Sequence, residues 1–196
     1  MKKLLIVVFF LSAATGFSQR FDILSGQLKN LKGITEFNVT FDYKDLKVHG
    51  YDTEEAYLQD KMKKREEKGT DETFKAAWYA DRGSKYEPKF IEYFNKKFDN
   101  GEIKVAKNPE AKYTMNIKTL WIYPGYSVVA AAEPAKITAI VTISETANPS
   151  NILVSIEFDK SIGIEQGQFD FDQGYRIAGA YEKLAKNLSM QLKRFL

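Results

Sequence analysis

The first regular pattern in the chain is an alternation of apolar and polar positions over residues 34–43. Successive side chains of a strand point to opposite faces, so this alternation predicts a strand with one buried face. The apolar positions are Phe37, Val39, Phe41 and Tyr43. A strand of this kind needs other elements to cover its apolar side.

A helical period follows between residues 52 and 100. Apolar residues recur every three or four positions in three segments, as on the buried face of an amphipathic helix. Asp52 is expected to cap the first helix, and Thr70 or Asp71 to start the second. The third helix carries an aromatic stripe whose spacing is typical of a packed core. The stripe consists of Phe90, Phe94 and Phe98.

Beyond Gly101 the apolar period shortens to about two residues, which predicts strands. Four are expected, around residues 103–105, 113–123, 137–143 and 152–158. In the long second one, Trp121 and Tyr123 are expected on the same face as Ile117. Short connections favour an antiparallel meander of these strands.

A final helix is expected from about Gln173, because apolar residues recur there at steps of three and four. The element order is therefore strand, helices, four strands and helix. This order predicts an α+β fold, a two-layer sandwich whose mainly antiparallel sheet is covered by helices on one face.

The first residues predict export. Two lysines precede an apolar run over residues 4–11, and small residues follow near Ser18, as in a secretory signal peptide. We therefore expect residues 1–18 to be removed. Residues 19–33 are expected to form a polar lead-in, and residues 34–196 a single α+β domain without a transmembrane segment.

Composition limits the classes of partner. The net charge of the 196-residue chain is +3, and it falls to +1 when Lys2 and Lys3 leave with the signal peptide. This balance gives no basic surface for nucleic acid. The mixed-charge run at residues 61–68 is expected to be a solvated helix face. With no cysteine, the chain can form neither a disulfide nor a cysteine-linked lipid, so it is expected free in the periplasm or outside the cell.

Few catalytic chemistries remain open. His49 is the only histidine, and it is interpreted as a surface residue; zinc sites of histidine and cysteine are excluded, and no cofactor is expected. Asp170 and Asp172 would share one side of an extended segment and could hold a calcium ion. Asp172 is more simply interpreted as the N-cap of the final helix. A glycan hydrolase would need two such carboxylates about 5 to 10 Å apart across a cleft.

Residues 120–137 place apolar residues where a hairpin loop is expected. The pair Pro124-Gly125 fits a type II turn, with glycine where φ must be positive. If the following segment folds back, Val128 and Val129 join the core, and this outcome is favoured; if it projects, it forms a contact surface with its aromatic neighbours. The candidate binding residues are Trp121, Tyr123, Pro124, Gly125 and Tyr126.

Several short motifs also carry a resemblance. They are Ala77-Trp78-x-Ala80-Asp81-Arg82, Tyr86-Glu87-Pro88-Lys89-Phe90, Ala111-Lys112-Tyr113-Thr114, Tyr123-Pro124-Gly125-Tyr126, Glu145-Thr146-Ala147-Asn148-Pro149 and Asp172-x-Gly174-x-Arg176-Ile177. With them the chain resembles a group of small secreted proteins of Bacteroidetes type, a group with no assigned function. The resemblance covers most of the expected mature chain and implies no catalytic residues. In its fold, the element order is distantly similar to small periplasmic domains that assist envelope assembly.

The sequence thus predicts a non-enzymatic secreted or periplasmic binding module. Its expected partner is an envelope protein or an outer-membrane component, bound through the surface around residues 121–126. Two alternatives remain open. One is a carboxylate-dependent hydrolase of envelope or extracellular glycans, and the other is a homodimer formed through an edge strand or through the apolar loop.

Overall fold

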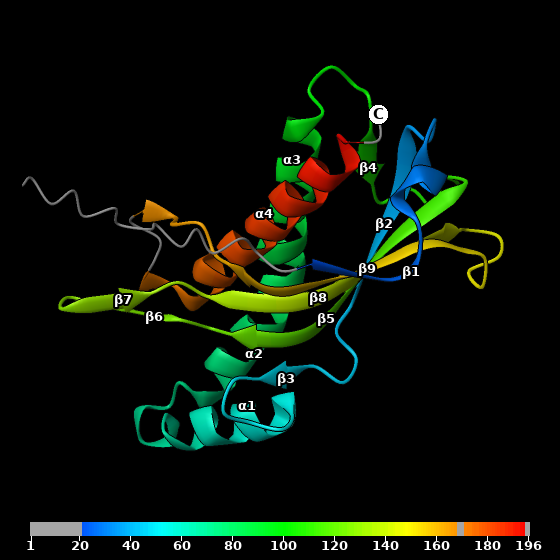
Figure 1. Ribbon diagram of the computed structural model, residues 1–196. Helices are drawn as coiled ribbons and strands as arrows, with labels where there is room; N and C mark the ends of the chain where they lie inside the picture. The colour runs from blue at the N-terminus through cyan, green and yellow to red at the C-terminus, as the bar shows by residue number, and fades with distance from the viewer. Residues whose placement is uncertain (1–20, 168–170, 195–196) are drawn as a thin grey trace, which may run out of the picture.

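The computed structural model describes residues 21–167 and 171–194 (Figure 1). The expected signal peptide and Asp170, the candidate calcium-binding carboxylate, lie outside these residues. In the described part, the chain forms an α+β fold with a large, mainly antiparallel sheet, as its periodicity predicts.

The main sheet has the strand order β1-β9-β8-β5-β2-β4, and β3 pairs with the end of β5. Its strands are β1 (Phe21–Gly26), β2 (Glu36–Asp42), β3 (Lys47–Val48), β4 (Lys104–Ala106), β5 (Tyr113–Tyr123), β8 (Lys136–Glu145) and β9 (Ile152–Ile162). A separate two-stranded ladder consists of β6 (Tyr126–Val128) and β7 (Ala131–Glu133). Strands β5, β8 and β9 form an antiparallel meander, in agreement with the prediction.

The predicted meander is wrong for β4, which pairs in parallel with β2 at the edge of the sheet. The helices between β2 and β4 supply the long crossover that a parallel pair requires. They return the chain beside β2, so β4 does not extend the meander next to β5.

The predicted lead-in is also wrong from Phe21 onward, because β1 pairs antiparallel with β9. The side chains of β1 are mostly exposed, so its sequence lacks the apolar alternation that marks a half-buried strand. Leu28 and Leu31 follow in a short 3-10 helix and are buried. The sheet therefore begins before residue 34.

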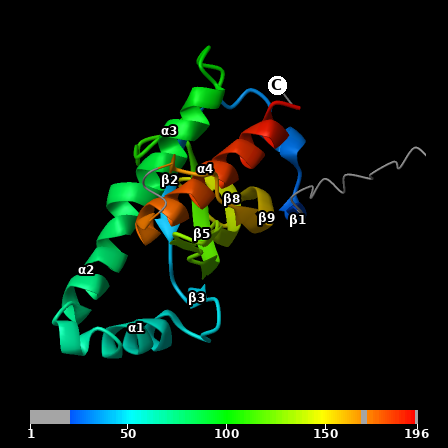
Figure 2. The same ribbon diagram turned by 90° about the vertical axis from the view of Figure 1, so that its left-hand side faces the viewer.

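The described α-helices are α1 (Glu54–Lys63), α2 (Asp71–Asp81), α3 (Glu87–Lys97) and α4 (Gln173–Leu192). A π-helical segment, Arg82–Tyr86, joins α2 to α3 in one continuous rod (Figure 2). The cap of α1 is Thr53 and not Asp52 as predicted. The Thr53 hydroxyl accepts a hydrogen bond from the N–H of Ala56 at 3.1 Å, because its own backbone is still extended.

The core lies between the sheet and the helices α3 and α4, which run side by side (Figures 1 and 2). The predicted aromatic stripe of α3 is buried, as is the apolar stripe of α4. Tyr181 of α4 also shares a hydrogen bond of 2.6 Å with the hydroxyl of Thr119 in β5. This pair satisfies two buried polar groups and ties α4 to the strand that carries the candidate site.

We expect Leu184→Ala to lower the free energy of unfolding by about 2–5 kcal/mol, because Leu184 is completely buried and its truncation leaves a cavity. Met190→Ala on the same helix is the matched control, since Met190 is half exposed, and its effect should stay within about 0.5 kcal/mol. Urea denaturation monitored by circular dichroism measures both values. Equal losses would contradict the placement of α4.

Candidate functional site

A β-bulge sets the position of the predicted aromatic residues. Strand β5 pairs in register with β8 as far as Thr119, and the register shifts before Trp121. Leu120 is therefore an extra residue in β5. One inserted residue exchanges the two faces of a strand, because side chains alternate between them.

The exchange of faces moves aromatic rings to the surface. Beyond the bulge, Ile122 is buried in the core. Trp121 and Tyr123 are half-buried and line a surface hollow. The prediction that both continue the core face of Ile117 is wrong for this reason.

His49 reaches the same surface through β3. This short strand pairs in parallel with the end of β5, and the N–H of His49 donates to the carbonyl of Ile122 at 2.8 Å. The imidazole ring lies edge-on to Trp121 at 5.7 Å and to Tyr123 at 5.0 Å between ring centres. The rings of Trp121 and Tyr123 are nearly parallel, at 17° and 6.4 Å. We name His49, Trp121 and Tyr123 the aromatic cluster.

Two hollows meet at the aromatic cluster, and His49 and Tyr123 line both. The first, of about 270 Å³, also has Trp121, Lys136 and Lys160 in its wall. The second, of about 440 Å³, lies between α1, the segment after β5 and the start of α4. We name the second the basic hollow, because α1 and the residues after it contribute three cations to its wall. They are Lys61, Lys64 and Arg65.

One carboxylate lies next to these cations. Asp60 accepts hydrogen bonds from the hydroxyl of Tyr51 and, at 2.7 Å, from the ammonium of Lys64. These bonds lower the pKa of Asp60 from the ordinary 3.8 to about 2. The ammonium of Lys61 lies over the rings of Tyr51 and Tyr57, at 5.7 and 5.4 Å from their centres. A single negative charge beside three positive ones leaves the basic hollow net positive.

Tyr123 is held as a hydrogen-bond donor. Its hydroxyl donates to Glu133 at 2.6 Å, and Lys136 donates to the other oxygen of that carboxylate at 2.7 Å. Burial and the bond to Glu133 raise the pKa of Tyr123 to about 12, while Lys136 and Tyr123 lower the pKa of Glu133. Near neutral pH the phenol therefore stays protonated and the carboxylate stays charged.

The ladder of β6 and β7 projects from the end of the sheet (Figure 1). We name it the arm. Val129 at its tip is fully exposed and Val128 is 57% exposed, so the favoured prediction that both join the core is wrong. The arm is free of the core because both strands of the hairpin are interrupted at its base, at residues 124–125 and 134–135.

Gly125 does not reverse the chain, although its φ is +64° as the predicted turn requires. The chain continues in the same direction into β6, and it reverses only at Val129 and Ala130. A Cβ atom on Gly125 would collide with the backbone of Glu133 and Pro134 across the arm. Glycine is thus required both by the dihedral angle and by the close approach of the two strands.

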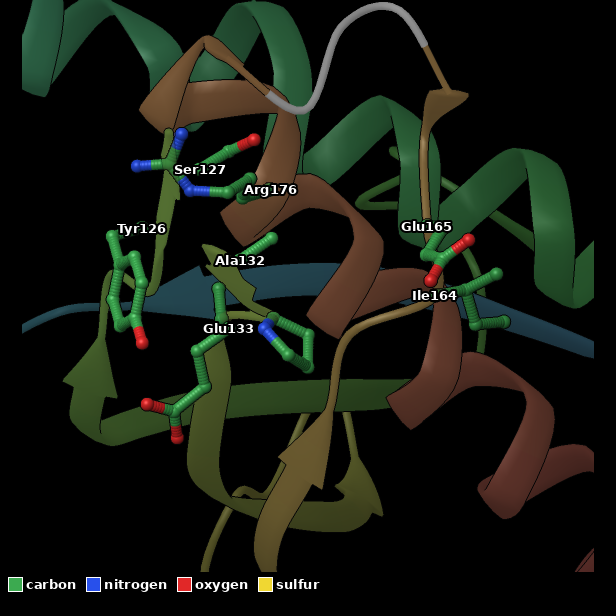
Figure 3. A pocket seen from close by; sticks show the side chains of 9 residues that line it. Tyr126, Ser127, Ala132, Glu133, Ile164, Glu165 and Arg176 are labelled. Atoms are coloured by element: carbon green, nitrogen blue, oxygen red, sulfur yellow. The ribbon is translucent and has the colours of Figure 1, made fainter. Parts of the chain in front are cut away.

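Arg176 of α4 holds the base of the arm. Its guanidinium donates to the carbonyls of Pro124 at 3.2 Å and Gly125 at 3.3 Å, and to that of Phe171 at 3.1 Å. Figure 3 shows this side chain reaching toward the arm beside a small hollow of about 100 Å³. The contact connects the core helix α4 directly to the arm.

Asp172 has the capping geometry predicted for it. Its carboxylate accepts the N–H groups of Gly174 at 2.7 Å and Tyr175 at 3.2 Å, and Lys85 donates to both of its oxygens at 3.1 Å. Burial alone would raise the pKa of Asp172, but these bonds lower it overall. Within residues 21–167 and 171–194, no three histidine, cysteine or acidic side chains gather as a metal site would require.

All five predicted binding residues line the two hollows. His49, the cations at residues 61–65 and Arg176 are further residues of the site that the sequence pattern does not predict. A two-residue strand carries no periodic pattern, and a mixed-charge run looks the same whether or not it borders a hollow. Among the described residues, no helix has the length and apolarity needed to cross a membrane. Comparison of the chain with protein families, with curated proteins and with solved structures finds no match.

We expect Gly125→Ala to destabilise the protein more than Gly69→Ala. Both glycines have a positive φ, which costs other residues about 1–2 kcal/mol. Only at Gly125 does the added Cβ also meet backbone, whereas Gly69 faces open space. Thermal unfolding measures the difference, and limited proteolysis should show faster cleavage of the arm in Gly125→Ala. Equal melting temperatures would contradict the described arm base.

Acid should weaken the contact between α1 and Tyr51. Because the folded-state pKa of Asp60 is depressed, its stabilising contribution is fully present above 3.8 and is lost as the pH falls to about 2. Asp60→Asn removes this titration, so its melting temperature should fall less steeply over that interval. Melting curves at successive pH values measure the two slopes, and parallel slopes would contradict the role of Asp60.

Proposed function

We propose that the protein is an exported, non-enzymatic binding module that recognises an anionic component of the cell envelope. The contact surface consists of the aromatic cluster and the basic hollow. The observation that carries this proposal is the meeting of three segments that are distant in sequence. His49, the cations at residues 61–65 and the aromatic residues Tyr123 and Tyr126 lie around the basic hollow, and Trp121 lines the adjoining hollow.

The charge of the basic hollow supports an anionic ligand. Concave surfaces lined by one sign of charge concentrate counter-ions of the other sign. The guanidinium of Arg65 is held by the carbonyl of Lys61 at 2.9 Å and lies 4.1 Å from the ring centre of Phe74. A guanidinium fixed in this way loses little freedom when it binds a carboxylate or phosphate.

The aromatic cluster supports a ligand that also has an apolar part. The nearly parallel rings of Trp121 and Tyr123 offer extended apolar area, and the hydroxyl of Tyr123 remains in place through Glu133. Tyr126, which is 44% exposed, extends this surface onto the arm. A charged group in the hollow beside an apolar portion on the rings is the combination that this surface fits.

A binding role is also favoured by the state of the polar groups. A general acid or base needs a pKa near the working pH, and the pKa values of Tyr123 and Glu133 are moved away from neutrality. Asp172, the described member of the pair considered for a glycan hydrolase, is occupied by the helix cap and by Lys85. We therefore prefer the binding module to the hydrolase.

We further infer that the fold is a two-layer sandwich in which helices cover one face of the sheet. The opposite face then remains available beside the aromatic cluster. A polar pair on neighbouring strands is consistent with an uncovered face: the amide of Asn116 donates to the hydroxyl of Thr40 at 2.9 Å, and both side chains are partly exposed. The expected export and the resemblance to small secreted proteins support a location of this surface in the envelope.

Binding of dextran sulfate, with neutral dextran as the uncharged reference, tests the proposal by calorimetry. We expect dextran sulfate alone to bind, with an affinity that falls as salt is added. The double variant Lys61→Ala/Lys64→Ala should bind roughly tenfold more weakly or worse, because a hydrogen bond to a charged group contributes about 1.5 kcal/mol or more. Trp121→Ala and Tyr126→Ala should also weaken binding.

The matched control is Lys29→Ala/Lys32→Ala, which removes the same charge from exposed residues near β1. Its affinity should remain that of the wild type. Equal weakening by the two double variants would mean that only net charge matters. Unchanged binding by folded Trp121→Ala and Tyr126→Ala proteins would contradict the assignment of the surface.

A further inference from the structure

The tip of the arm is uncharged and exposed. From Tyr126 to Ala132 the sequence is YSVVAAA, and the side chains of Val128 to Ala132 are all exposed. Contiguous apolar surface of this kind marks a contact site on a soluble domain. The arm therefore needs a partner whose surface suits an uncharged, apolar tip.

The turn at the tip is not made of turn-forming residues. Two-residue hairpin connections favour glycine, asparagine or aspartate, which accept positive φ values. Val129 and Ala130 occupy this connection, and neither has a positive φ. Because turn geometry does not account for these residues, their apolar character points to a contact made by the tip.

From the tip of the arm toward its base, the side chains change from apolar to aromatic and then to basic. The apolar tip is followed by Tyr126 and Tyr123 at the base of the arm, and then by the cations of the basic hollow. Figure 1 shows the arm and the connection between α1 and α2 on the same side of the molecule. A lipid surface presents the matching order of acyl chains, interface and anionic head groups, where apolar, aromatic and basic residues respectively reside.

The length of the arm fits the same partner. Val129 lies three residue steps beyond Tyr126, and a strand rises about 3.3 Å per residue, so the tip extends about 10 Å beyond the tyrosine. Interfacial segments insert about 5–10 Å into the boundary between head groups and acyl chains. A tip of this length reaches acyl chains while Tyr126 stays at the level of the head groups.

We infer that the arm inserts into an anionic lipid surface. Val128, Val129 and the alanines enter the acyl boundary, while Lys61, Lys64 and Arg65 bind lipid phosphates. This inference rests on the proposed function and specifies its anionic ligand as a lipid membrane. Protein partners are usually bound through large aromatic or arginine side chains that fill pockets, whereas the tip offers only small aliphatic ones. A bilayer requires no such pockets.

Sedimentation with vesicles tests the inference. The protein without the expected signal peptide, residues 19–196, is mixed with vesicles of phosphatidylglycerol and phosphatidylcholine, or of phosphatidylcholine alone. We expect binding to the anionic vesicles. Val129→Asp should weaken it by about tenfold or more, because it replaces the burial of a valine by a charge. Lys61→Ala/Lys64→Ala should weaken it about fivefold per cation, and Lys29→Ala/Lys32→Ala should not.

Insertion itself is measured with an environment-sensitive dye. The chain contains no cysteine, so Val129→Cys gives a single labelling site. Ser150→Cys, in the exposed turn between β8 and β9, is the matched control. The emission of the dye at position 129 should shift to the blue on anionic vesicles, and that at position 150 should not.

Three results would overturn the inference. An unshifted dye at position 129 on bound vesicles, or full binding by Val129→Asp, would mean that the protein adsorbs by charge alone. A blue shift that depends on protein concentration without vesicles, together with a dimer in light scattering, would mean that a second copy covers the tip. If vesicle binding fails while dextran sulfate still binds, the lipid inference falls and the proposed function stands; loss of both rejects both.

Discussion

The candidate site depends on the extra residue Leu120 in β5. Strict alternation past this point would carry Trp121 and Tyr123 into the core beneath the helices and would turn Ile122 to solvent. The bulge reverses both outcomes at once, so the core keeps a branched aliphatic side chain and the surface gains two aromatic rings. β3 then adds His49 to these rings by pairing with the residues just beyond the bulge. A register shift of one residue is thus enough to turn the end of a core strand into a partly exposed aromatic surface, the candidate site.

A second irregularity lies on the other side of β8. The register between β8 and β9 shifts between Ile137 and Ala139, and Lys160 of β9 adopts a φ of +47°. This conformation costs a residue with a side chain about 1–2 kcal/mol. The hydroxyl of Thr138 offsets part of the cost, because it accepts the N–H of Lys160 at 3.1 Å and donates to Asp159 at 3.0 Å. Strand β8 itself remains regular, and the register shifts of its neighbours β5 and β9 both lie next to Thr138. Lys160 lines the hollow beside Trp121 as a result.

Periodicity predicts the helices that are buried on one side over several turns and the strands that are buried on one side over several residues. It finds the aromatic stripe of α3, the stripe of α4 and the alternation of β8, because burial alone selects their residues. It misses β1, because Ile23 and Leu24 are both exposed and only Phe21, stacked on Phe158, packs against the core. It also misplaces Trp121. A one-residue insertion leaves the composition of the strand unchanged and alters only which face the following side chains lie on. The prediction that Val128 and Val129 join the core fails for a related reason: hydrophobicity alone does not distinguish a buried segment from an exposed one.

The carboxylate that the sequence offers as a candidate for chemistry acts on the site indirectly. Asp172 caps α4 and so fixes the first turn of that helix. Arg176 lies one turn further along, where its guanidinium can reach the carbonyls of Pro124 and Gly125. Pro124 and Gly125 interrupt the hairpin, and their carbonyls lack the regular cross-strand partners of a ladder. Arg176 satisfies them from the core helix, so the arm can leave the sheet and still be oriented by the core. The start of α4 is thus connected both to its own cap and to the base of the arm.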